Sequence, residues 1–127
     1  MKSQQTILLF EMEENKEKQI AALCQKLNIR VVHVAKEDYG QKLGCLAGIQ
    51  GFGREAARCQ GKGIPAEMLV FSGMDSEQVD EFLKEYKEAG IAPIGCKAII
   101  TPNNVFWTAE ELFRELLQEH MYFLNKK

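Results

Sequence analysis

Residues 68–79, Met68-Leu-Val-Phe-Ser-Gly-Met-Asp-Ser-Glu-Gln-Val79, decide the fold class. The apolar run Met68–Phe71 predicts a strand that is covered on both faces. Asp75 follows as a helix N-cap, because Gln78 stands three residues later and can complete a capping box. The apolar residues of this helix then recur at helical spacing: Val79, Phe82, Leu83 and Tyr86. Gly90 ends the helix, and residues 96–101 form the next strand.

The first half of the chain follows the same plan. Residues 6–10 predict a strand, and residues 15–27 predict a helix that ends at Asn28. Residues 30–34 then predict a second strand. Each half is therefore a strand–helix–strand unit with the same helix-ending device. Sequence identity between the halves is too low to indicate a duplication.

Two such units in tandem predict one α+β domain over residues 1–127, of the ferredoxin-like kind with strand order 4-1-3-2. The first and third strands are apolar throughout and should be central, whereas the second and fourth alternate and should be edges. The Gly-rich connection of residues 35–65 is long for this fold. Short helices are expected within 38–46 and 52–59. If one of them crosses the sheet, the fold is instead a small doubly wound α/β sheet.

An extra helix is expected at the C-terminus. Thr108 and Glu111 have capping-box spacing, and Trp107 can pack on Leu112 as a hydrophobic staple. A broad apolar stripe follows and should cover the second sheet face or another subunit. We expect Leu116 and Leu117 to be largely buried. The stripe consists of Leu112, Phe113, Leu116, Leu117, His120, Phe123 and Leu124.

Composition bounds the class of protein. The chain has 46% hydrophobic and 27% charged residues and a net charge of −2, which disfavours nucleic-acid binding. No apolar run approaches the length of a membrane span or signal peptide, so we expect a cytoplasmic protein without a membrane partner. The four cysteines lack metal-site spacing, and we expect reduced thiols, no metal and no cofactor. A metal site formed by Cys45, Cys59 and His33 is a minor alternative.

The Gly-rich connection contains the first candidate site. Gly51-x-Gly53-x-x-Ala56 resembles a dinucleotide fingerprint, but no strand immediately precedes it, which argues against a dinucleotide. Its backbone amides, flanked by Arg54, Arg58 and Lys62, could instead bind an anion. A surface loop or a partner-contact loop is the alternative.

The second candidate is the stretch from Lys97 to Trp107. Pro102 and the asparagines fit a turn, and Lys97 fits an edge strand that resists pairing with another sheet. A small polar pocket at the strand end is the functional alternative. No nucleophile elbow, P-loop or H-E-x-x-H motif occurs, and we predict no catalytic residues. His33 and His120 are interpreted as core or interface residues. The candidate ligand-binding residues are Gly51, Gly53, Arg54, Arg58, Lys97, Thr101, Asn103 and Trp107.

Several segments together resemble a small bacterial family, domain of unknown function family 3783. They are residues 39–48 with Gly51-Phe52, Met68–Gly73, Ala89–Ile94, and Lys97–Asn103 with Trp107-Thr108. The similarity spans nearly the whole chain, and residues 97–107 are its most specific part. The resemblance implies no activity, but it draws attention to the Gly-rich connection and the Lys97–Trp107 block.

We therefore expect a non-enzymatic binding or regulatory module for a small anionic ligand or a protein partner, with self-association left open. The competing hypothesis is an enzyme with a polar site between the Gly-rich connection and the Thr101–Asn104 turn. That hypothesis requires Lys97 or Arg54 to converge with Asn103 and the loop amides in one pocket.

Overall fold

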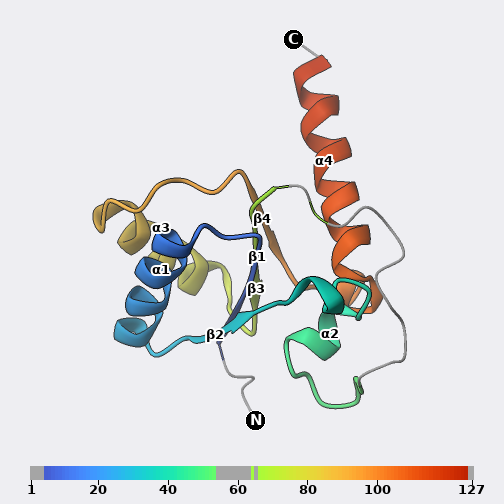
Figure 1. The fold of residues 1–127 in the computed structure, drawn as a ribbon, viewed down its shortest axis with the longest axis horizontal. Helices are drawn as coiled ribbons and strands as arrows, with labels where there is room; N and C mark the ends of the chain where they lie inside the picture. Colours follow the sequence, from blue (N-terminus) through green and yellow to red (C-terminus); the bar gives the residue numbers. More distant parts are fainter. Residues whose placement is uncertain (1–4, 54–63, 65, 126–127) are drawn as a thin grey trace.

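The computed structural model describes residues 5–53, 64 and 66–125, and the side chains of α4 as far as residue 118. Figure 1 shows the elements. In chain order they are β1 (Thr6–Phe10), α1 (Glu14–Leu27), β2 (Arg30–His33), the 3-10 turn η1 (Lys36–Asp38), α2 (Leu43–Leu46), β3 (Met68–Ser72), α3 (Ser76–Glu88), β4 (Cys96–Ile99), the 3-10 turn η2 (Asn104–Phe106) and α4 (Ala109–Asn125).

The four strands form one mixed sheet in the order β2-β1-β3-β4. β1 is parallel to β2, β3 is parallel to β4, and the central pair β1 and β3 is antiparallel. The predicted α+β class, central strands and edge strands are confirmed, but the order 4-1-3-2 is wrong. The two orders predict the same burial of each strand, because both place β1 and β3 in the centre of the sheet. The two orders differ in the strands that each helix connects. Here α1 joins the neighbouring strands β1 and β2, and α3 joins the neighbouring strands β3 and β4, whereas the predicted order places another strand between the members of each pair.

The doubly wound alternative is also wrong. It requires β3 to run parallel to β2, whereas β3 runs antiparallel to β1 and β1 runs parallel to β2. The connection after β2 does hold short helical segments: α2 lies within the predicted range of residues 38–46, whereas η1 overlaps that range only at Asp38. Most of the second predicted helix, residues 52–59, lies outside the described residues.

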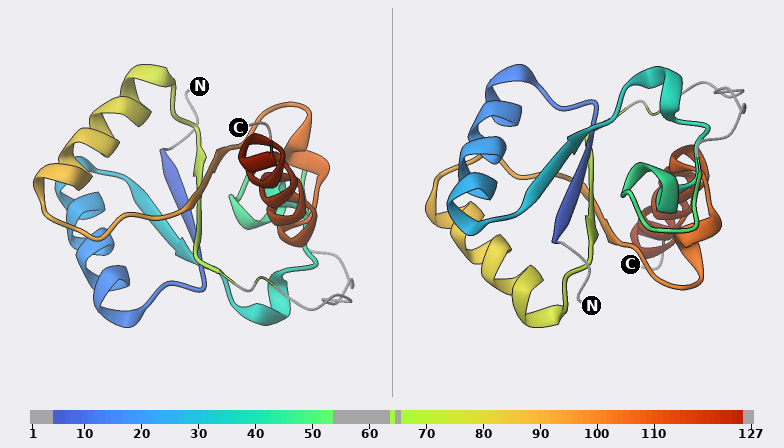
Figure 2. Two further views of the ribbon diagram at one scale, coloured as in Figure 1. Left: turned by 90° about the horizontal axis from the view of Figure 1, so that it is seen from above. Right: turned by 90° about the horizontal axis from the view of Figure 1, so that it is seen from below.

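Helical elements cover both faces of the sheet, as Figure 2 shows. On one face α1 and α3 pack side by side, with Ile7, Leu9, Leu69 and Phe71 of the central strands beneath them. On the other face Leu8, Phe10, Met68 and Val70 are covered by the connection and by the start of α4. The residues that cover this second face are Val34, Tyr39, Leu43, Leu46, Ala47, Ile64, Ala109, Leu112 and Phe113.

The start of α4 is as predicted, but its burial differs. Thr108 Oγ1 accepts a hydrogen bond from the Glu111 amide, and Glu111 Oε1 accepts one from the Thr108 amide, which confirms the capping box. Leu116 is only partly buried and Leu117 is 42% exposed. α4 meets the sheet with its first turns and then extends away from it (Figure 1). The connection covers the surface that the stripe was expected to cover.

The two halves repeat one plan, and the repeat continues beyond the predicted strand–helix–strand units. Each half has a five-residue central strand, a helix, an edge strand, a 3-10 turn and a second helix. Leu8 and Val70 occupy the same position in their strands and pair with each other at the centre of the sheet. Lys42 and Thr108, which directly precede α2 and α4, also pair as an isolated bridge. These two contacts define a pseudo-twofold axis through the molecule.

Within the described residues, no helix is both long enough and apolar enough to pass through a bilayer.

Candidate functional site

The structure separates Lys97 from Trp107. In the parallel pair of β3 and β4, Lys97 aligns with Leu69, which belongs to the core under α1 and α3. Trp107 packs against the core of the opposite face. Lys97 therefore does not share a pocket with Trp107. The small hollow that Lys97 lines contains neither Asn103 nor a described residue of the connection, and Arg54 lies outside the described residues. The enzyme hypothesis for this site stays a prediction.

The Thr101–Asn104 turn has a structural explanation. The Thr101 amide donates to Asn104 Oδ1 at 2.8 Å, and the Asn104 amide donates to Thr101 Oγ1 at 3.1 Å. Asn104 Nδ2 also donates to the Ile99 carbonyl at 3.0 Å, so this buried side chain closes the end of β4. Thr101 and Asn103 are exposed. The buried residue of this turn is thus Asn104, whose capping-box spacing from Thr101 was the available signal.

The Gly-rich connection is only partly described. Gly44 is required sterically, because a Cβ there would lie 2.6 Å from the ring of Phe52. Gly51, with φ of +95°, and Gly53 are exposed and face open space. Arg54 and Arg58 lie outside the described residues, so the anion site stays a prediction. Cys59, one of the three proposed metal ligands, also lies outside them. No cluster of three metal-binding side chains occurs in the part of the chain that is described.

A polar cavity lies at the carboxyl ends of the parallel strands β1 and β2. Its volume is about 250 Å³. Carboxyl ends of parallel strands are where ligands commonly bind in α/β proteins, because the loops that leave the strands diverge there. We call it the carboxyl-end pocket. Its lining residues are Leu9, Glu11, Met12, Glu17, His33, Val34, Ala35, Lys36 and Tyr39.

Glu11 enters this pocket from a strained backbone. It directly follows β1 and has a φ of 55°, a left-handed conformation that costs a side-chain-bearing residue about 1–2 kcal/mol. Its carboxylate accepts a hydrogen bond from the Tyr39 hydroxyl at 2.5 Å. Tyr39 is 2% exposed, and its ring packs on Phe10 with centroids 5.8 Å apart. The connection therefore positions Tyr39, and Tyr39 holds the carboxylate of Glu11.

His33 and Glu17 join β2 to α1 along the same pocket. His33 Nδ1 contacts Glu17 Oε1, and both side chains are partly exposed. His33 is the last residue of β2, and Glu17 lies one turn into α1. A carboxylate at Nδ1 orients the imidazole ring and leaves Nε2 as the other polar atom. The pocket thus holds two fixed pairs, Tyr39 with Glu11 and His33 with Glu17.

The second half provides an internal control for these residues. The residue directly after the central strand is Glu11 in one half and Gly73, with φ of 71°, in the other. The fourth residue of the following helix is Glu17 or Val79, and the last residue of the edge strand is His33 or Ile99. The same framework therefore forms with glycine, valine and isoleucine at the three positions. The framework of the second half thus forms without polar residues at these three positions.

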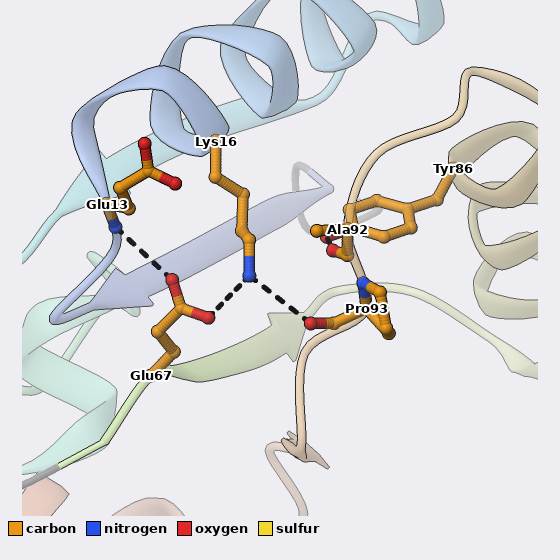
Figure 3. Close-up of polar contacts among 6 residues, drawn as sticks. All are labelled: Glu13, Lys16, Glu67, Tyr86, Ala92 and Pro93. Atoms are coloured by element: carbon orange, nitrogen blue, oxygen red, sulfur yellow. Dashed lines mark hydrogen bonds and ion pairs between the residues drawn. The ribbon is translucent and has the colours of Figure 1, made fainter.

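A second polar cluster ties the halves together (Figure 3). Lys16 Nζ lies 2.5 Å from Glu67 Oε1 and donates to the Pro93 carbonyl at 3.2 Å. The Glu13 amide donates to Glu67 Oε2 at 3.2 Å. The Tyr86 hydroxyl donates to the Ala92 carbonyl nearby, and burial, followed by the charge of Glu67, raises the pKa of Tyr86 to about 12.

This cluster is saturated by protein groups. The Lys16 side chain is only 9% exposed and the Glu67 side chain 26%. A buried pair with both partners satisfied fixes how elements meet, and it offers little to a ligand. We therefore assign it a structural role at the junction of α1, β3 and the loop before β4. Its partners are far apart in the chain, so no local sequence pattern indicates this cluster.

A larger hollow of about 470 Å³ lies between the last turns of α1 and α3. It opens on helix surfaces, and its charged residues include Lys26 and Glu85, which face each other at 3.8 Å. No strand end or strained residue lies in it, so we place the candidate site at the carboxyl-end pocket. His33 was predicted to be a core or interface residue but is exposed at this pocket, and no sequence motif pointed to Glu11 or Glu17. The sequence signal for this site was Glu11, which directly follows the first strand at the position where the second half has Gly73.

No curated protein and no solved structure matches the chain significantly. The stretch of residues 39–48, which contributed to the resemblance described above, lies outside the matched range of the family comparison. The resemblance is confirmed for the second half of the chain. Residues 67–123, which contain β3, α3, β4, η2 and most of α4, match the family described as Domain of unknown function (DUF3783).

Proposed function

We propose that the protein is a non-enzymatic binding or regulatory module whose small ligand occupies the carboxyl-end pocket. One observation carries this proposal: Glu11, Glu17 and His33 stand where the equivalent half has Gly73, Val79 and Ile99. Three polar residues that the framework does not need converge on one cavity. Convergent polar groups in a preformed cavity are typical of ligand sites.

The conformation of Glu11 supports the same proposal. Left-handed backbone on a residue other than glycine is found preferentially at functional sites, where the surroundings hold it in place. At Glu11 the holding group is Tyr39, which is buried and comes from the connection. Glycine at position 11 would remove the strain, as Gly73 does in the other half. A glutamate at a position where glycine would be unstrained therefore favours a role for its carboxylate.

The charged residues around the pocket differ from those of the Gly-rich connection. An anionic ligand was expected from Arg54 and Arg58, and that expectation stays a separate proposal for the connection. The carboxyl-end pocket contains two carboxylates, from Glu11 and Glu17, beside Lys36 and His33. A ligand of this pocket must therefore be compatible with two negatively charged side chains. A protein partner would have to insert a side chain, because the cavity is only about 250 Å³.

The test uses the second half as its template. A triple variant, Glu11→Gly, Glu17→Val and His33→Ile, reproduces the residues of the other half at three equivalent positions. The thermal midpoint of both proteins is measured against a panel of amines, amino acids, organic acids and nucleotides. Mass action predicts that a ligand raises the midpoint of the wild type. We expect no increase in the folded triple variant. Equal shifts in both proteins, or none in the wild type, would contradict the proposal.

One observation favours an enzyme as the second candidate. A histidine oriented through Nδ1 by a carboxylate, as His33 is by Glu17, has the arrangement of a general base. The discriminating experiment incubates a compound that binds with substoichiometric protein and analyses the mixture by mass spectrometry. Conversion that is lost in His33→Gln, with binding retained, would favour the enzyme. Unchanged compound favours the binding module.

A further inference from the structure

We infer that the ligand of the carboxyl-end pocket is a primary alkylamine bound as its ammonium ion. The inference rests on the proposed function, because it identifies the ligand class of that same site. It combines the acceptor atoms that the pocket leaves free, its apolar lining and its charge.

The free acceptors come from Glu11 and Glu17. Tyr39 engages Oε2 of Glu11, and His33 engages Oε1 of Glu17. Among the described residues, the second oxygen of each carboxylate has no protein partner. Each carboxylate is thus held in place by one oxygen while the other can accept a hydrogen bond. An ammonium group has three donors and no acceptor, which suits a site that presents charged acceptors.

The remaining lining fits an alkyl chain. Leu9 of β1 and Val34, which directly follows β2, are buried, and Met12 of the β1–α1 loop is partly buried. These residues give the lining an apolar part beside the two carboxylates. An alkylamine has the same division into a charged head and an apolar chain. A cavity of about 250 Å³ limits the chain to a short one.

Charge disfavours the opposite ligand class. Of the described residues that line the pocket, Lys36 is the only one with a fixed positive charge, and it is exposed. Glu13 and Glu37 add further carboxylates on the adjoining loop and in η1. The equivalent positions in the second half, Gly73 and Val79, carry no charge. The two carboxylates that line the pocket therefore have no counterpart at the equivalent positions of the second half.

The experiment compares three probes of similar size and different charge: n-butylamine, n-butanol and butyrate. Affinity is measured by calorimetry on the full chain at neutral pH and constant ionic strength. We expect only n-butylamine to bind. Glu11→Gln and Glu17→Gln should each weaken binding by about tenfold, because each loses a charge-assisted contact. Glu14→Gln, on the exposed start of α1, is the matched control and should leave the affinity unchanged.

Folding of each variant is checked by its thermal midpoint, and both glutamine variants keep an acceptor for Tyr39 or His33. The inference is overturned if n-butylamine does not bind, or if Glu14→Gln weakens binding as much as Glu17→Gln. If an anion or neutral compound of the panel binds the wild type but not the triple variant, the pocket proposal stands and the ammonium inference alone fails. If no compound binds, both fail.

Discussion

The two halves of the molecule share a framework and differ at the carboxyl ends of their strands. In the second half this end is built from Gly73, Val79 and Ile99, and its turn is closed by Asn104. In the first half the same positions carry Glu11, Glu17 and His33 around a cavity. The comparison separates what the fold needs from what it does not. Positions that carry the same kind of residue in both halves form the framework. Positions at which the two halves differ are candidates for function.

The framework itself predicts the largest effect. Ala109, Leu112 and Phe113 are buried over the second sheet face, whereas α2, the equivalent helix of the first half, has only four residues. A fragment of residues 1–107 should therefore be unfolded or aggregating, since each large side chain contributes about 1.5–3 kcal/mol when buried. Circular dichroism and light scattering provide the measurement. A soluble fragment with a cooperative melt would show that α2 and the connection suffice as cover.

Single truncations of α4 should follow its graded burial. Leu112 is 3% exposed, and Leu112→Ala should lower the free energy of unfolding by about 2–5 kcal/mol. Leu116 is only partly buried, so Leu116→Ala should cost clearly less, about 1 kcal/mol. Urea denaturation measures both values. Equal losses would mean that α4 packs on the sheet further along than its first turns.

Lys16→Met tests the cluster that joins the halves. It leaves Glu67 partly buried without its cation, and we expect a loss of about 2–4 kcal/mol, below the range for a fully buried pair because Glu67 is 26% exposed. Lys18→Met, whose pair with Glu14 is exposed, is the matched control and should change stability by less than about 0.5 kcal/mol. A loss no greater than that of the control would argue against a structural role.

Gly73 and Glu11 directly follow the two central strands with a positive φ, and they should respond differently to substitution. Gly73→Ala should cost about 1–2 kcal/mol, because alanine disfavours a φ of 71°. Glu11→Gly relieves strain of that size but loses the Tyr39 hydrogen bond, so its net effect should lie within about 1 kcal/mol. Gly53→Ala, in open space without a positive φ, is the control for Gly73. A large loss in Glu11→Gly would assign Glu11 to the framework.

The smallest effect concerns Tyr86 and Cys24, which occupy the same helical position in α3 and α1. Burial raises the pKa of both groups to about 12, with the charge of Glu67 adding to the effect at Tyr86. A raised pKa favours the folded state while the group is protonated. The contribution of Tyr86 is therefore present below pH of about 10, the ordinary value, and is lost as pH rises towards 12.

The measurement is the urea midpoint across that range for the wild type and Tyr86→Phe. Cys24 titrates in both proteins, so their difference isolates Tyr86. The wild type should lose more stability than the variant between pH of about 10 and 12. Parallel curves would mean that Tyr86 titrates as it does in the unfolded chain.

Local signals in the sequence predicted local structure well. The capping boxes at Asp75 and Thr108 are present, and both helices of the strand–helix–strand units lie where periodicity indicated. The strand order was not predictable from burial, because β2 is an edge strand in either order. Burial of α4 was overestimated, because the path of the connection could not be deduced from its glycines and it competes for the same sheet face.

The candidate site was predicted less well than the fold. Lys97 and Trp107 lie in one sequence block, but they lie on opposite faces of the sheet. Lys97 aligns with Leu69 on the face that α1 and α3 cover, whereas Trp107 packs against the core of the other face. Glu11 and Glu17 look like ordinary acids at the start of a helix. Only their positions relative to β1 and α1, compared with the same positions in β3 and α3, reveal that they correspond to Gly73 and Val79. The repeat was visible in the sequence, but the equivalence of positions required the structure.

The pairing of Leu8 with Val70 has a consequence for how the chain folds. Neither half can shield both edges of its central strand, because the neighbour on one side belongs to the other half. The pairing of β1 with β3 closes a chain loop that contains α1, β2 and the whole connection. The chain entropy lost on closing this loop must be overcome before most of the stabilising contacts of the sheet can form. We therefore expect a single cooperative transition whose rate is limited by the meeting of β1 and β3, slower than that of a helical bundle of equal length.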